Sequence, residues 1–312
     1  MVSSDKNINT PMPTKDERYM RRALDLASSG AGHVSPNPMV GAVIVAPDGR
    51  IIGEGFHRRY GEGHAEVNAI ASVAEEDIPL LRESTIYVTL EPCSHYGKTP
   101  PCAKLLCDKG VKRCVIGTGD PNPKVAGRGI KMLRDAGIEV TENVLKEECL
   151  AINERFFTAQ TQKRPWILLK WAENSDGSTN APDGSPIAIS SPATRALMHR
   201  ERSLCDAIMV GTGTLLSDNP SLTTRHWPGK SPIPVIFSSE RIENPEVRAN
   251  LKIFNRRPII LDADIPLEEN MKILFEHHGI TSLMVEGGPT LIKSFIDAGL
   301  YDRIRTERNE SI

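Results

Sequence analysis

The sequence predicts an α/β protein that folds as two domains, and three observations support this fold class. The chain has 312 residues, which is more than one hydrophobic core usually organises. Short apolar, β-rich segments alternate with segments of helical periodicity, a pattern typical of α/β layers. The polar stretch Gln160–Arg164, followed by Pro165, interrupts this alternation. We therefore expect one domain at residues 14–150 and a second at residues 164–312.

The first half begins with a helix that Thr14 or Asp16 can cap and that ends near Ser28, before Gly30. Strands at 40–46 and 51–56 flank a turn with an Asp-Gly pair, which indicates a β-hairpin. The elements expected next are a helix at 64–74, a strand at 85–90, a helix at 102–109, a strand at 112–117, a helix at 127–136 and a strand at 138–140. This order predicts a three-layer α/β domain.

The second half begins after a helix expected at 147–162, and it alternates in the same way. We expect strands at 166–171, 206–210, 234–237, 258–261 and 282–286, and helices from Ser191 to about 202 and from about 290 to 298. Asp-Gly pairs at 176–177 and 183–184 predict turns. These elements indicate a second α/β domain.

Composition excludes several classes of protein. The net charge of −2 leaves no basic footprint for nucleic acid or a membrane surface. No apolar run approaches the roughly 20 residues of a membrane span, and the polar first fourteen residues do not resemble a secretory signal. Six cysteines without such a signal favour a reducing compartment. We expect a cytoplasmic protein with no nucleic-acid or membrane partner. Because two-domain enzymes commonly self-associate, we also expect a homo-oligomer.

One set of residues in the first half predicts a zinc site. His64, Cys93 and Cys102 are residue types that bind zinc, and three protein ligands leave a fourth position open for water. Glu66 lies two positions from His64, so the two side chains do not share a helix face and Glu66 suits a proton-transfer role. This arrangement is the ligand set of zinc nucleobase deaminases, although the usual Cys-x-x-Cys is stretched here to eight intervening residues. A buried structural His with two core cysteines is the alternative.

The second half contains two glycine turns after expected strands, at 211–214 and 287–290. The chain has no Gly-x-Gly-x-x-Gly after a strand, so an ordinary dinucleotide-binding fingerprint is absent. Free backbone N–H groups in such turns can hold a phosphate. Either a nucleotide site or two ordinary loops would explain them.

Eight motifs together resemble the bifunctional deaminase–reductase family of riboflavin biosynthesis, from about Asp16 to Asp302. Those in the first half are Ser35–Gly41, His64–Ala69, Glu91–Cys102 and Asp120–Gly129, and those in the second half are Leu168–Ala172, Ile189–Pro192, Asp218–Thr223 and Val285–Leu291. The resemblance implies a cytidine-deaminase-like first domain and a dihydrofolate-reductase-like second domain.

For the first domain, the resemblance implies zinc-dependent deamination of 2,5-diamino-6-ribosylamino-4(3H)-pyrimidinone 5′-phosphate. By motif position, His64, Cys93 and Cys102 would bind one Zn²⁺, and Glu66 would be the proton donor. Asn37, His57 and Lys98 would contact this substrate.

For the second domain, the resemblance implies reduction of the ribosyl group to ribityl by NADPH. The residues that would face NADPH are Ala172, Thr214, Asp218, Ser238, Gly288, Pro289, Thr290, Leu291, Ile292, Lys293 and Ser294. Those that would face the substrate are Arg202, Leu222, Arg225 and Glu286, with the two arginines suited to its phosphate.

The end of the chain departs from the family pattern. After Ile304 the family continues through further strands, whereas here the polar octapeptide Arg305–Ile312 follows. A missing strand would leave backbone groups unpaired, so the sequence predicts a truncated and weakened reductase domain. Two other functions remain open. One is a deaminase with a degenerate second domain, and the other is a nucleotide-binding module with structural zinc, which Glu66 argues against. Deamination of cytidine or of a tRNA base is conceivable on the chemistry, but the net charge and the lack of interleaved basic and aromatic residues disfavour RNA.

Overall fold

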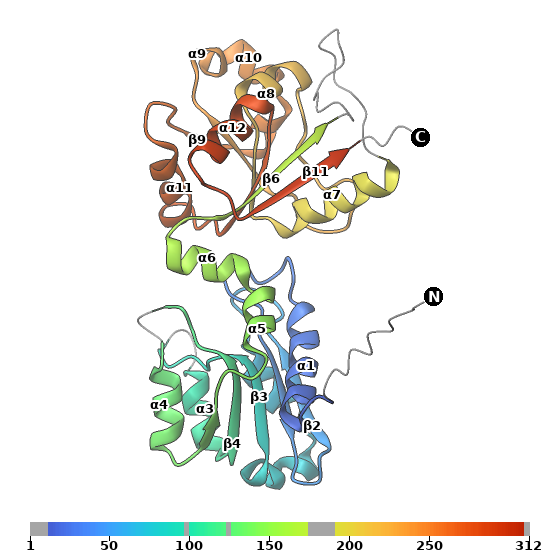
Figure 1. Cartoon of the computed structure of the whole chain (residues 1–312), viewed down its shortest axis with the longest axis vertical. Helices are drawn as coiled ribbons and strands as arrows, with labels where there is room; N and C mark the ends of the chain where they lie inside the picture. Colours follow the sequence, from blue (N-terminus) through green and yellow to red (C-terminus); the bar gives the residue numbers. More distant parts are fainter. Residues whose placement is uncertain (1–11, 97–99, 123–125, 174–190, 309–312) are drawn as a thin grey trace, which may run out of the picture. The chain divides into compact units, whose positions relative to one another are not determined.

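The computed structural model describes residues 12–96, 100–122, 126–173 and 191–308, which fold into two compact units (Figure 1). The first unit comprises the chain up to Gly30 together with Met39–Ile152, and the second comprises Ala31–Pro38 and the chain from Asn153. Within the described residues, no helix has the length and apolar character needed to cross a membrane.

The first unit is a three-layer α/β structure, as predicted. Its strands are β1 (Gly41–Val45), β2 (Ile51–Phe56), β3 (Thr85–Leu90), β4 (Arg113–Thr118) and β5 (Glu139–Thr141). Its helices are α1 (Lys15–Ser28), α2 (Ala65–Ala71), η1 (Glu75–Glu83), α3 (Cys102–Lys109), α4 (Arg128–Asp135) and α5 (Lys146–Ile152). The strand order is β2-β1-β3-β4-β5, with β1 antiparallel to β2 and β3, and the β3–β4 and β4–β5 pairs parallel.

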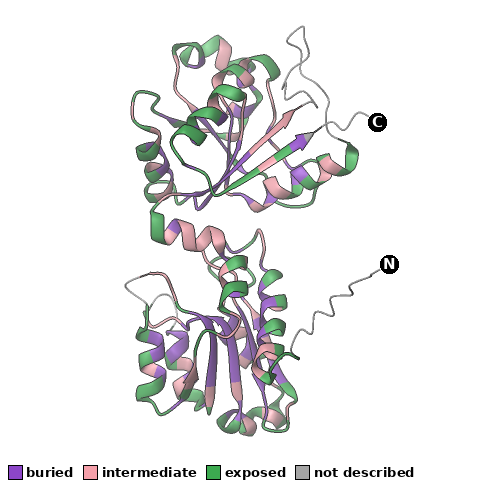
Figure 2. Cartoon of the chain, in the orientation of Figure 1, coloured by how far each residue is buried: buried purple, intermediate pink, exposed green. Residues whose placement is uncertain are grey.

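Two apolar layers hold this sheet between its helices. Alternate residues of β1, β3 and β4 pack against α2, α3 and α4 on one face, and the others against α1 and α5 on the opposite face. Figure 2 shows these strands as the most buried part of the unit. Gly55 allows β2 to lie directly against α2, because a Cβ at this position would be 2.3 Å from the backbone nitrogen of Ala69. This close packing fixes the helix that begins beside His64.

The second unit is also a three-layer α/β structure, built on a six-stranded sheet. Its strands are β6 (Trp166–Glu173), β7 (Ala207–Met209), β8 (Ile233–Phe237), β9 (Ile259–Leu261), β10 (Ser282–Glu286) and β11 (Arg303–Arg308). Its helices are α6 (Glu154–Gln162), α7 (Pro192–Leu204), α8 (Thr212–Asp218), α9 (Glu240–Glu243), α10 (Pro245–Asn250), η2 (Lys252–Arg256), α11 (Leu267–Glu276) and α12 (Pro289–Asp297). The order is β11-β6-β10-β7-β8-β9, and every pair is parallel.

Helices cover both faces of this sheet. One apolar layer contains residues of α11 and α12, and the other contains residues of α7, α8 and α9. Helices α8 and α12 therefore follow the neighbouring strands β7 and β10 but pack on opposite faces. Such a point in a parallel sheet, where successive connections diverge, leaves a crevice at the carboxyl ends of the strands.

The sequence did not predict η1, η2 or the helices α8 to α11. Two further features also differ from the prediction. The helix expected at 147–162 is two helices, α5 and α6, because Asn153 between them is buried with φ −113° and ψ 20°. The polar end of the chain was not expected to form a strand, yet Arg303–Arg308 pairs with residues Leu168–Glu173 of β6 (Figure 1). The described residues thus leave β6 paired along both sides, by β10 and β11.

Candidate active sites

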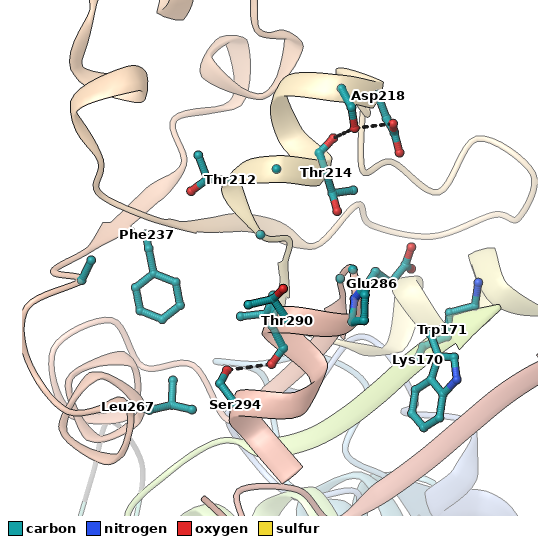
Figure 3. A pocket seen from close by; sticks show the side chains of 18 of the residues that line it. Lys170, Trp171, Thr212, Thr214, Asp218, Phe237, Leu267, Glu286, Thr290 and Ser294 are labelled. Carbon is teal, nitrogen blue, oxygen red and sulfur yellow. Dashed lines mark hydrogen bonds between the residues drawn. The ribbon is translucent and has the colours of Figure 1, made fainter. Parts of the chain in front are cut away.

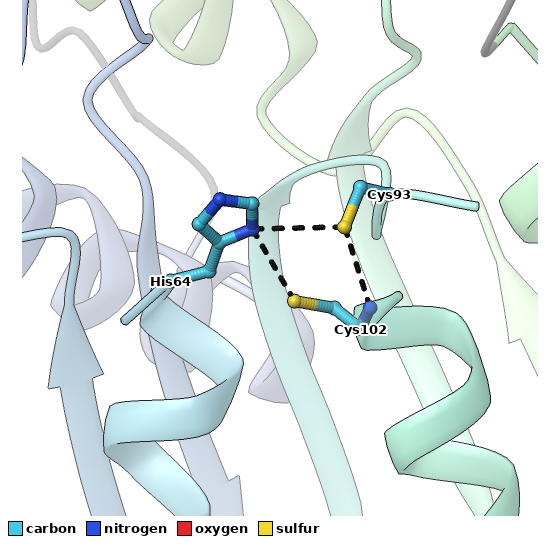
Figure 4. Close-up of side chains that lie close together, drawn as sticks. All are labelled: His64, Cys93 and Cys102. Carbon is cyan, nitrogen blue, oxygen red and sulfur yellow. Dashed lines mark hydrogen bonds between the residues drawn. The ribbon is translucent and has the colours of Figure 1, made fainter. Parts of the chain in front are cut away.

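The first candidate site is in the first unit, where the start of α2, the end of β3 and the start of α3 come together. His64 is the residue before α2, Cys93 follows the end of β3, and Cys102 begins α3 after two prolines. The His64 Nδ1 atom is 3.6 Å from Cys93 Sγ and 3.4 Å from Cys102 Sγ (Figure 4). The backbone N–H of Cys102 donates a hydrogen bond of 3.3 Å to Cys93 Sγ. One ligand atom from each residue lies within 4.8 Å of the others, so together they form a cluster able to hold a metal ion.

The electrostatic surroundings favour the metal-binding form of Cys93, whereas the hydrogen bond with Cys93 and burial raise the pKa of the Cys102 thiol. The hydrogen bond with Cys102, followed by that with His64, lowers the pKa of the Cys93 thiol far below its ordinary value. A thiolate is the form of cysteine that binds a metal ion. One imidazole and two sulfur ligands suit zinc, and three ligands make a site with an open fourth position.

Glu66 is buried beside this cluster, on the first turn of α2. Its residue is 3% exposed, and burial, together with the nearby charge of Cys93, raises the pKa of its carboxyl to about 7. A carboxyl group poised near neutrality can both accept and deliver a proton. Glu66, two positions after His64, is not one of the three residues of the metal-binding cluster.

The three residues expected to contact the deaminase substrate fall in different places. His57 is buried, packs edge-on against the His64 ring at a centroid distance of 5.4 Å, and places its Nδ1 3.1 Å from the carbonyl oxygen of Gly63. Asn37 lies half-buried in the loop between α1 and β1. Lys98 lies outside the described residues. Asp120, which begins one of the motifs quoted above but was given no role, donates its N–H to Glu91, and burial raises the pKa of its carboxyl.

The second candidate site is a cleft of about 1070 Å³ in the second unit. It opens at the carboxyl ends of β6, β7, β8 and β10, where α8 and α12 begin on opposite faces of the sheet (Figure 3). The two glycine turns noted in the sequence lie on either side of it, at Gly211–Thr214 and at Gly287–Thr290. The turn at 211–214, expected to be a loop, forms the first residues of α8.

Most residues expected to face NADPH line this cleft. They are Ala172, Thr214, Asp218, Ser238, Gly288, Pro289, Thr290, Leu291 and Ser294. Ile292 and Lys293 do not line it, which corrects the sequence expectation. The side chain of Ile292 is buried in the core beneath α12, and Lys293 pairs with Asp297 on the exposed face. Consecutive residues of a helix point in different directions, so only one side of α12 can face the cleft.

The residues expected to face the reductase substrate form an adjoining group. Arg202 donates two hydrogen bonds to the carboxylate of Glu286, of 2.7 and 2.6 Å, and a third of 3.0 Å to the carbonyl oxygen of Thr223. Glu286 lines the large cleft. Arg202, Leu222 and Arg225 line a smaller cavity of about 290 Å³, and Asp218 borders both spaces.

Several lining residues were missed by sequence reasoning. Lys170, Trp171, Thr212, Phe237 and Leu267 also line the cleft (Figure 3). The available signal was their position, because Lys170, Trp171 and Phe237 lie near the ends of expected strands that reach the same edge of the sheet. Lys170 also pairs with Glu307 of β11 at 3.3 Å.

Comparison with known proteins identifies relatives for both units. Residues 13–118 match the cytidine and deoxycytidylate deaminase zinc-binding region, and residues 165–306 match the RibD C-terminal domain. The riboflavin biosynthesis protein RibD of Aquifex aeolicus is 39% identical over 309 residues, covering 93% of this chain and 85% of the relative. RibD of Escherichia coli is 36% identical over 322 residues, covering 93% and 86%.

Solved structures agree with these matches. A diaminohydroxyphosphoribosylaminopyrimidine deaminase/5-amino-6-(5-phosphoribosylamino)uracil reductase from Thermotoga maritima superposes with a TM-score of 0.82 at 40% identity, covering 91% of this chain and 84% of that one. RibD of Acinetobacter baumannii gives a TM-score of 0.81 at 33% identity, covering 94% and 86%. The matches extend through both units, which argues against a degenerate second domain.

Proposed function

Because this chain belongs to the RibD family of riboflavin biosynthesis, whose members join a zinc-dependent deaminase to an NADPH-dependent reductase, we propose residues and a substrate for each step. The first domain, at residues 14–150, removes an amino group from 2,5-diamino-6-ribosylamino-4(3H)-pyrimidinone 5′-phosphate. The second domain, at residues 164–312, then reduces the ribosyl group of the product to ribityl.

In the deaminase, His64, Cys93 and Cys102 hold the zinc ion. Their ligand atoms, within 4.8 Å of one another, form the donor set that zinc prefers. A zinc ion held by these residues would supply a water molecule whose pKa is lowered towards about 7.

Glu66 transfers the proton in this reaction. Its buried carboxyl, whose pKa is raised to about 7, takes a proton from the attacking water and passes it to the ring nitrogen and the leaving ammonia. His57, which packs against His64, contacts the pyrimidine. Asn37 and Lys98 stay predicted substrate contacts.

In the reductase, NADPH occupies the large cleft between α8 and α12. The backbone N–H groups at Gly288 and the following first turn of α12 face a phosphate of the cofactor, since a helix N-terminus favours an anion. Thr214 and Asp218, both in α8, and Ser238, which follows β8, contact the rest of the cofactor. The protein's task here is to hold the hydride donor against the ribosyl carbon and to exclude water.

The substrate of the reductase occupies the space shared by the cleft and the smaller cavity. Arg202 and Arg225 bind its phosphate, since guanidinium groups match phosphate geometry. Glu286 orients Arg202 through two hydrogen bonds and faces the sugar from the cleft. Homo-oligomer formation and location in the cytoplasm stay predictions.

The observation that carries the deaminase assignment is the cluster of His64, Cys93 and Cys102 with Glu66 buried beside it. The test is to incubate zinc-analysed protein with the diaminopyrimidine phosphate, with and without NADPH. We expect ammonia release in both reactions and NADPH oxidation in the second. Ammonia without NADPH oxidation would support a deaminase alone, and no ammonia from zinc-loaded protein would refute the assignment.

A further inference from the structure

We propose that Glu91 is a positioning residue of the deaminase, which fixes the loop after β4 onto the corner that carries Cys93. This inference rests on the proposed deamination at the His64 cluster, and it assigns a role to a carboxylate that has no part in the chemistry described above.

The carboxylate of Glu91 is buried and is held by backbone groups from one stretch of chain. The residue is 4% exposed. Its Oε2 atom accepts hydrogen bonds from the N–H groups of Asp120 and Gly127, at 3.3 and 3.0 Å, and its Oε1 atom accepts from those of Gly129 and Ile130, at 3.0 and 3.3 Å. Hydrogen bonds to an ionised carboxylate are about twice as strong as neutral ones. Glu91 therefore ties Asp120 and the residues Gly127, Gly129 and Ile130 at the start of α4 to a single point.

The other side of this clamp is rigid. The backbone N–H of Glu91 donates to the carbonyl oxygen of Thr118 at 2.9 Å, which extends the pairing of β3 with β4. Glu91 also precedes Pro92 and Cys93, so it anchors the loop at the residue pair that leads into the metal cluster. Because Glu91 directly follows the central strand β3, its carboxylate holds its hydrogen-bond donors in a fixed position relative to the sheet.

The hydrogen bonds to Glu91 require glycine at two positions, Gly127 and Gly129. Gly127 has φ +74°, a conformation that favours glycine, and it thereby directs its N–H to Glu91. A Cβ at Gly129 would lie 2.0 Å from the carbonyl oxygen of Pro92. The first turn of α4 thus contacts the backbone immediately before Cys93, and only glycine fits there.

The clamp holds the chain that follows β4 beside the chain that leads from β3 to Cys93. Asp120, which comes shortly after β4, donates its N–H to Glu91, and β3 and β4 are paired up to Leu90 and Thr118. If the clamp is released, zinc remains held by its own three ligands, but Asp120 and the start of α4 are free to shift relative to Cys93. We therefore expect substrate binding to suffer more than zinc binding.

The test is Glu91→Gln, which places an amide NH₂ against N–H groups that need an acceptor. We expect the deaminase kcat/KM to fall between about ten- and a hundredfold, mainly through a higher KM. Zinc content and the reduction of separately supplied deaminated substrate should match wild type. Asp135→Asn is the matched control, because Asp135 lies on the same helix α4 but pairs with Lys131 at the surface.

A second variant separates positioning from folding. Glu91→Asp keeps the charge but is one methylene shorter, so it should retain zinc and fold while losing part of the deaminase kcat/KM. The proposal is overturned if the KM of Glu91→Gln stays within about twofold of wild type. It is also overturned if both variants lose activity only in proportion to lost zinc or folded protein. Absence of ammonia release by zinc-loaded wild type would instead refute the proposed function.

Discussion

Replacing Glu286 by Gln removes the carboxylate that holds Arg202 in the reductase site. Both side chains are largely buried, at 15% exposure for Arg202 and 14% for Glu286. Arg202 keeps its hydrogen bond to the carbonyl oxygen of Thr223, but its remaining N–H groups then face a neutral amide. The substitution therefore leaves the buried positive charge of Arg202 without the negative charge of Glu286 beside it.

The expected loss in the free energy of unfolding follows from this geometry. Removing one partner of a buried ion pair costs about 3–5 kcal/mol, and Gln retains one acceptor for a hydrogen bond to Arg202. We expect the free energy of unfolding of the second unit to fall by about 2–4 kcal/mol. We also expect a higher KM for the reductase substrate, because Arg202 is no longer oriented.

Urea unfolding followed by tryptophan fluorescence measures this cost in the second unit. The three tryptophans of the chain, Trp166, Trp171 and Trp227, all lie in that unit. The control is Asp297→Asn, which removes an exposed i,i+4 pair with Lys293 and should cost less than about 0.5 kcal/mol. A loss below about 1 kcal/mol for Glu286→Gln would refute the inference that this ion pair is buried and structurally important.

The pH dependence of the free energy of unfolding provides a second test of this ion pair. Burial alone would raise the pKa of Glu286, but the hydrogen bonds and charge of Arg202 outweigh it and lower the pKa below its ordinary value. The stability that the pair contributes is thus present above the ordinary carboxyl pKa of about 4.3 and is lost as the pH falls through the lower folded value. Glu286→Gln should remove this acid-side loss.

Two further predictions concern the first unit. Cys102→Ser should lower the zinc content well below the roughly one ion per chain expected of wild type, measured by metal analysis, and a retained full equivalent would contradict the ligand assignment. Asp16→Asn should cost about 1–3 kcal/mol at neutral pH, measured by calorimetry, because Asp16 accepts hydrogen bonds of 2.9 and 2.8 Å from Arg113 and one of 2.9 Å from Tyr87. The Arg113 hydrogen bond lowers the pKa of Asp16, so this contribution should vanish only in acid, below about pH 4. An unchanged acid limb in the variant would contradict it.

Local signals in the sequence predicted much of the first unit. Helix α1 is capped by Thr14, one of the two candidates from the sequence, which forms a reciprocal capping pair with Glu17. Strand β3 and helix α3 have the expected bounds, Thr85–Leu90 and Cys102–Lys109. Prolines before a helix and β-rich runs act over a few residues, so they can be interpreted without the tertiary structure.

Features that depend on distant partners were not predictable in this way. Strand β11 is polar and is a strand because β6 offers it a row of backbone partners. Helix α11 was missed. The ion pair of Arg202 with Glu286 and the clamp of Glu91 on α4 join residues far apart in the chain. The error at Ile292 and Lys293 had a different cause, since a continuous motif was assigned to the cofactor without the rotation of the helix.

The most direct test of the account is the variant Glu66→Gln, assayed for both steps. We expect about one zinc ion per chain, no measurable ammonia release from the diaminopyrimidine phosphate, and normal NADPH oxidation when the deaminated product is supplied. This outcome would place proton transfer at Glu66 and the reduction at the separate cleft. Ammonia release at the wild-type rate by zinc-loaded Glu66→Gln protein would contradict the account.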